Sequence, residues 1–145
     1  YNMGILYRDG LGVEKNSQVA LAWFNLAAQQ QHTLANFAIA KLLEKNADLH
    51  STEMDPLYYL KEASFLGHAV APLEVGNFYY SRQESPYDLV RAIVWWMLSL
   101  ERNAPGASEN ISEISSSLDE NQMDAISVKL AECDSQTLRK CLTNF

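Results

Sequence analysis

The strongest constraint on the fold is a spacing of 36 residues that recurs along much of the chain. Small residues return at this interval, and so do large apolar residues and histidines. The recurring sets are Gly4, Ala40 and Gly76; Tyr7, Leu43 and Tyr79; Trp23, Tyr59 and Trp95; Ala35, Ala71 and Ala107; and His32 and His68. A fixed period of roughly 20–50 residues indicates stacked structural repeats.

Within the first period, the apolar residues predict two helices joined by a glycine-containing turn. Residues 1–9 predict the first helix, and Asn16 or Ser17 is expected to cap a second helix that runs to about Gln30. Four residues of this second helix occupy one buried face at helical spacing. They are Ala20, Trp23, Phe24 and Ala27. We expect Trp23 to fill the gap between the small alanines.

The same reasoning predicts an all-α fold, an α-solenoid of about three 36-residue helix–turn–helix repeats followed by a C-terminal helical cap. The repeats span residues 1–106, and the cap spans residues 107–145. The units are about 1–32, 33–68 and 69–106. By this register the first unit is truncated at its N-terminus. Trp23 and Trp95 are expected to occupy similar environments, and Trp96 is expected between units or towards solvent.

The cap region is more polar than the repeats, as the outer face of a terminal repeat requires. Asp119 with Gln122 resembles a capping box and predicts the start of an amphipathic helix. The residues expected to face inward on that helix are Met123, Ile126, Leu130 and Cys133.

Composition and motifs limit the possible functions. The net charge of −7 argues against nucleic acid and anionic membranes as partners, because both are bound through basic patches. The longest apolar run, Ala92 to Leu98, is far shorter than the roughly 20 residues of a membrane helix. His32 and His68 share one repeat position, which favours a structural role over a metal site. We expect no metal, no cofactor and no catalytic residues.

The first unit resembles the Sel-one-like repeat, a family of helix–turn–helix repeats related to tetratricopeptide repeats. The matching residues are Met3-Gly4, Tyr7, Gly10, Gly12-Val13, Ala20, Trp23-Phe24 and Ala27-Ala28. The resemblance extends to about Ala107 but weakens, with Pro56 and Ser99-Leu100 departing from the family pattern. It implies a non-enzymatic scaffold or adaptor that binds a protein or peptide.

By the same resemblance, the first helix of each unit lines a concave binding face. The candidate partner-binding residues are Tyr1, Ile5, Arg8, Phe37, Lys41, Glu44, Leu73, Asn77 and Tyr80. A rival interpretation is a secreted, hydrolase-like repeat protein acting on cell-wall or β-lactam substrates, but no nucleophile with an adjacent base is evident from the spacing. A third interpretation is the terminal cap of a larger scaffold.

Two cysteines, Cys133 and Cys141, bear on localisation. On one continuous helix they would lie about 12 Å apart, too far to bond. If the chain turns between them, they meet across a helical hairpin, and otherwise they are two buried thiols. Secreted members of the resembled family staple hairpins with this spacing. The resemblance therefore implies a disulfide and a bacterial periplasmic or secreted protein, whereas free thiols would fit a cytoplasmic one.

Overall fold

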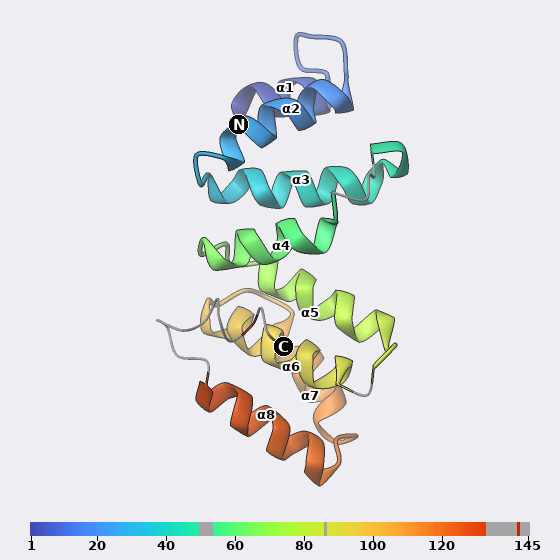
Figure 1. Ribbon diagram of the computed structural model, residues 1–145, viewed down its shortest axis with the longest axis vertical. Helices are drawn as coiled ribbons and strands as arrows, with labels where there is room; N and C mark the ends of the chain where they lie inside the picture. Colours follow the sequence, from blue (N-terminus) through green and yellow to red (C-terminus); the bar gives the residue numbers. More distant parts are fainter. Residues whose placement is uncertain (50–53, 86, 133–141, 143–145) are drawn as a thin grey trace. The chain divides into compact units, whose positions relative to one another are not determined.

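The computed structural model describes residues 1–49, 54–85, 87–132 and 142, and within these ranges it contains helices and no strand (Figure 1). The all-α class predicted from the sequence is confirmed. The elements are α1 (Asn2–Asp9), α2 (Ser17–Ala28), α3 (Thr33–Lys45), the 3₁₀-helix η1 (Ala47–Leu49), α4 (Pro56–Phe65), α5 (Ala71–Arg82), α6 (Asp88–Glu101), α7 (Ala107–Ser115) and α8 (Glu120–Glu132).

The helices form two compact units, Tyr1–His68 and Ala69–Phe145. In the first unit α1 packs on α2, α2 on α3, and α3 on α4, while in the second α5 packs on α6, and α6 on α7 and α8. Neighbours in sequence are thus neighbours in space, as in a helical repeat solenoid. The predicted division at residues 106 and 107 stays a prediction.

Local capping places the ends of the first two helices close to where the sequence predicts them. Gly10 ends α1 in the left-handed conformation, at φ 73°, and its N–H donates to the Leu6 carbonyl at 2.8 Å. The Asn16 side chain accepts from the N–H of Val19 at 3.0 Å and so starts α2.

Helix α6 begins at Asp88. The Asp88 carboxylate accepts the N–H groups of Glu84 and Ser85, each at 2.9 Å, and pairs with Arg91 at 2.7 Å. The Ser85 hydroxyl accepts the N–H of Tyr87 at 3.2 Å, so the buried carboxylate and this serine together organise the turn into the helix.

Two helical hairpins are closed by a glycine on the first helix that faces a large residue 20 positions later. A Cβ on Gly4 would lie 2.5 Å from the Phe24 ring, and one on Gly76 would lie within 3.0 Å of the Trp96 ring. Close approach of the helices therefore depends on glycine at these two positions. The repeat-equivalent residues of the hairpin between them, Ala40 and Leu60, are buried too.

The predicted burial of Trp23 is wrong. Its side chain is 39% exposed, whereas Trp95 at the equivalent position is 1% exposed, so the two do not share an environment. Phe24 fills the space that the sequence assigned to Trp23, because it is the residue of α2 that faces Gly4. Trp96, expected between units or towards solvent, is buried over Gly76.

In the C-terminal region the capping box is confirmed. The N–H of Asp119 donates to the Gln122 side chain at 3.0 Å, and the N–H of Gln122 donates to the Asp119 carboxylate at 2.7 Å. Ile126 is buried as predicted, but Met123 is 49% exposed and does not face inward. The Leu130 side chain, Cys133 and Cys141 lie outside what the structure describes, so the predicted disulfide is not tested.

Candidate functional site

The two histidines that keep the repeat spacing stack on aromatic rings. Tyr1 and His32 stack with ring centroids 4.7 Å apart, and Phe37 and His68 stack at 4.2 Å. Both pairs are 31 residues apart, so the stack is itself part of the repeat. This stacking is the structural role that the sequence favours for the histidines. It also means that Tyr1 and Phe37, two residues of the predicted binding face, contact residues of this chain.

The other predicted face residues of the first unit contact neighbouring residues of the same unit. Ile5 packs against the core cluster of α2 and α3. The Arg8 guanidinium donates to both carboxylate oxygens of Asp9, at 2.8 and 2.6 Å, and Lys41 pairs with Glu44 at 2.6 Å.

In the second unit, one predicted face residue serves internal packing. The Asn77 side-chain oxygen accepts from Trp96 Nε1 at 3.0 Å and from Asn110 Nδ2 at 3.1 Å, and so ties α5 to α6 and α7. The Tyr80 ring lies tilted against the Trp96 ring, with the two ring centroids 5.4 Å apart. Leu73 is partly exposed and lies close to Gly106. Whether the nine residues form one partner-binding face stays a prediction.

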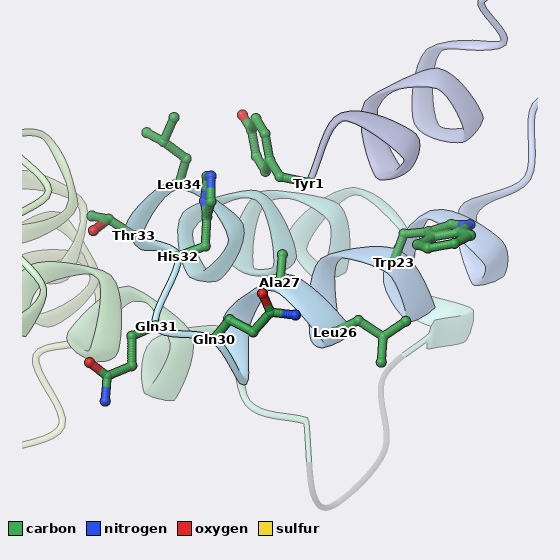
Figure 2. A pocket seen from close by; sticks show the side chains of 9 residues that line it. All are labelled: Tyr1, Trp23, Leu26, Ala27, Gln30, Gln31, His32, Thr33 and Leu34. Atoms are coloured by element: carbon green, nitrogen blue, oxygen red, sulfur yellow. The ribbon is translucent and has the colours of Figure 1, made fainter.

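A hollow of about 810 Å³, here called the neutral hollow, opens at the junction of α2 and α3 (Figure 2). Trp23 and Leu26 project on one side of Ala27, and Tyr1 and His32 on the other. None of the side chains that line it carries a formal charge at pH 7 with His neutral. They are Tyr1, Trp23, Leu26, Ala27, Gln30, Gln31, His32, Thr33 and Leu34. Three of them are large and exposed apolar side chains, with Leu26 at 51% and Leu34 at 47% beside Trp23.

The residue that occupies the Trp23 position one hairpin later is packed against buried apolar residues. Tyr59 of α4 stands 36 residues after Trp23 and packs against a buried cluster to which α2 contributes Ala20, Leu21 and Phe24. The position of Trp23 is therefore one that, in the next repeat, packs against a buried apolar cluster built from α2 and α3.

A second hollow of about 430 Å³, here called the basic hollow, lies between the end of α1, the start of α2 and the end of α3. It is lined by Arg8, Asp9, Lys15, Ser17, Ala38, Lys41, Leu42, Lys45 and Asn46. The Arg8 hydrogen bond lowers the pKa of the Asp9 carboxyl, and the charges of Lys15 and Lys45 lower it further.

Backbone turns bring the basic side chains together. The left-handed Gly10 lets the chain double back, so that the Asn16 N–H reaches the Tyr7 carbonyl at 2.9 Å and Lys15 lies beside α1. The Ser17 hydroxyl donates to Asn46 Oδ1 at 3.3 Å, and Asn46 Nδ2 donates to the Leu42 carbonyl at 2.7 Å. These bonds hold the start of α2 against the end of α3.

Sequence reasoning missed Lys15, Lys45 and the exposure of Trp23. Arg8 and Lys41 were identified from their helix, but Lys15 belongs to the turn and Lys45 to the helix end. The signal available was charge. Four of the 11 basic residues of this acidic chain fall within residues 8–45. The residue 36 positions after each of them is not basic.

Two buried serines are hydrogen-bonded to the backbone. Buried Ser64 and Ser99 donate to the backbone carbonyls of Leu60 and Ala69, at 2.8 and 3.4 Å. Among the residues that can be assessed, no three His, Cys, Asp or Glu side chains are grouped as a metal site would need. In the same part of the chain, no helix is both long and apolar enough to span a bilayer.

Comparison with known proteins finds similarity to one repeat family. The Sel1 repeat family model matches residues 1–32. The chain is 28% identical over 118 residues to the chitin synthase regulator SKT5 of the fungus Malassezia restricta, a match that covers 79% of this chain and 8% of that protein. The chain thus spans less than a tenth of that relative. Together these matches support a Sel1-like repeat protein, and Sel1 repeats generally mediate protein–protein interaction.

Proposed function

We propose that this Sel1-like repeat protein is a non-enzymatic adaptor that binds an amphipathic helix of a partner protein in the neutral hollow. The interaction role general to Sel1 repeats supports this proposal, and the similarity to a protein named as a regulator fits it. The predicted concave face and the predicted bacterial, periplasmic or secreted setting remain proposals beside it.

The observation that carries the proposal is the different fate of Trp23 and Tyr59. Tyr59 packs against the cluster that contains part of α2, whereas Trp23, one repeat earlier, is 39% exposed beside two further exposed leucines. A contiguous exposed apolar surface marks an interaction site. Aromatic side chains such as Trp and Tyr are the usual anchors of such sites.

The repeat also indicates the chemistry of the occupant. The α2 residues in the cluster against which Tyr59 packs are Ala20, Leu21 and Phe24, at positions i, i+1 and i+4 of a helix. A partner helix with a small residue, a leucine and an aromatic residue at this spacing would offer Trp23 an apolar surface of the same composition. Binding of an amphipathic helix in an apolar groove is a common mode of peptide recognition.

The hydrolase alternative has less support. The two buried serines donate to the backbone carbonyls of Leu60 and Ala69. A nucleophile of this kind requires a base within hydrogen-bond reach. The relatives and the geometry therefore favour a scaffold over an enzyme.

The test is binding of a labelled peptide that copies residues 16–31 of this chain, followed by fluorescence anisotropy. We expect saturable binding that is lost when Leu21 and Phe24 of the peptide are replaced by glutamine. In the protein, Trp23→Gln with Leu26→Gln should also abolish it. Tyr87→Gln with Leu100→Gln, two exposed apolar residues of the second unit, is the matched control and should bind normally.

Either of two results would refute the helix-binding proposal. One is equal affinity for the native and glutamine-substituted peptides. The other is equal loss of binding with the control pair in the second unit. Concentration-dependent self-association that disappears with Trp23→Gln would also refute it, because the hollow would then bind a second copy of this chain.

A further inference from the structure

We propose that the basic hollow is a second, independent binding site, which accepts an acidic segment of a partner protein. Its ligand is a peptide stretch whose Asp or Glu carboxylates meet the cationic rim. The site lies on α1, α2 and α3, and it uses two residues of the predicted first-helix face, Arg8 and Lys41.

The charge of the hollow is opposite to that of the molecule. Four cationic side chains and one carboxylate line it, in a chain of net charge −7. The one carboxylate, Asp9, is already bonded to Arg8 and lies within the electrostatic influence of Lys15 and Lys45. Because Arg8 pairs with Asp9 and Lys41 with Glu44, Lys15 and Lys45 supply the excess positive charge that a second carboxylate would complement.

The second unit contains the repeat-equivalent hollow, and it serves as an internal comparison. Lining residues of the two hollows correspond at a spacing of 72 residues, which is two repeats. The corresponding pairs are Arg8 and Tyr80, Ser17 and Leu89, Leu42 and Ile114, and Lys45 and Ser117.

The hollow itself is thus a product of the repeat, but its charge is not. The hollow in the second unit has a volume of about 570 Å³, and no basic side chain is among its lining residues. Its one charged lining residue is Glu84, which pairs with Arg82. Because the same hollow forms without cations, the cations of the basic hollow are not required by packing.

The floor of the basic hollow adds an apolar contact. Ala38 and Leu42 are buried members of the core cluster and also line the hollow. A segment that combines carboxylates with an apolar side chain would therefore match both the rim and the floor. A nucleic acid fits less well, since the acidic remainder of the chain would repel a long polyanion.

The experiment measures anisotropy of a labelled peptide in which Asp and Glu flank a central leucine. The comparison peptide carries Asn and Gln in their place. We expect saturable binding of the acidic peptide, at least about tenfold weaker binding of the neutral one, and loss of affinity as salt is raised. Lys15→Gln with Lys45→Gln should weaken binding by about tenfold, since both lysines are exposed and their removal leaves the core intact.

The matched control is Arg82→Gln with Lys129→Gln, which removes the same charge from the second unit and should leave binding unchanged. Equal affinity for the two peptides would overturn the proposal, and so would equal weakening by the control pair. Tighter binding of a single-stranded DNA oligonucleotide than of the acidic peptide would also overturn it. The helix-binding proposal for the neutral hollow is unaffected by each of these results, because it is tested with a different peptide and different residues.

Discussion

Gly76 of α5 lies directly beneath the indole of Trp96 on α6, and a Cβ on this glycine would collide with the ring. Trp96 is buried, and its Nε1 donates to Asn77, the residue after that glycine. The pair thus combines close helix approach with a buried and satisfied indole. The same small-to-large relationship joins Gly4 to Phe24 in the first unit.

Gly76→Ala should destabilise the second unit by about 1–3 kcal/mol, because the added methyl group overpacks a filled site. Urea unfolding followed by circular dichroism measures the change. Adding Trp96→Leu copies the Ala40–Leu60 pair of the middle hairpin, and the double variant should be more stable than the sum of the single changes predicts. Strict additivity would show that the contact does not limit helix approach.

Trp23→Ala and Phe24→Ala should differ in their effect on stability, although the residues are adjacent. Phe24 is fully buried over Gly4, so its loss should cost about 3–5 kcal/mol. Trp23 is exposed, so its loss should cost under about 1 kcal/mol. The denaturant midpoints of unfolding of the two variants measure this difference in stability. A larger loss for Trp23 would mean that the tryptophan is part of the core after all.

Asp88 should make stability depend on pH. Burial acts to raise the pKa of its carboxyl, but the hydrogen bonds from Arg91, Ser85 and Glu84 and the Arg91 charge outweigh burial, so the pKa is lowered. A carboxyl with a lowered pKa stabilises the fold above its unfolded pKa of about 3.9, and this contribution is lost as the pH falls through the folded value.

Asp88→Asn should therefore cost about 1–3 kcal/mol near neutral pH and progressively less in acid. Chemical denaturation of the variant and the parent across the acid range gives the difference. Asp124→Asn, a change at an exposed carboxylate of α8, is the control. A difference between Asp88→Asn and the parent that does not change with pH would count against the ionic role of Asp88.

The cysteine prediction concerns residues that the structure does not describe, and it rests on the family resemblance. A bond between Cys133 and Cys141 would close a short loop, which should add roughly 2–3 kcal/mol by the chain-entropy estimate. Intact-mass analysis after alkylation, with and without reductant, detects it in natively sourced protein. Two freely alkylated thiols in unreduced protein would favour the cytoplasmic alternative.

Much of the fold was predictable because it depends on local chemistry and on spacing. The 36-residue period predicts helical hairpins, Gly10 and Asn16 mark helix ends, and Asp119 with Gln122 marks the start of α8. Such signals act within a turn or two of the chain, so they can be read without knowing what packs where.

The tertiary structure alone decided which side chains of these helices are buried and which are exposed. Trp23 and Phe24 are adjacent, and only the packing of α2 on α1 sets the phenylalanine against Gly4 and leaves the tryptophan exposed. Likewise, Lys15 and Lys45, 30 residues apart in sequence, line one hollow because a turn and a helix end converge there. The sequence by itself determined the helices and their repetition, because these follow from local spacing. The structure determined the core and the two hollows, because burial and charge proximity depend on contacts between distant segments.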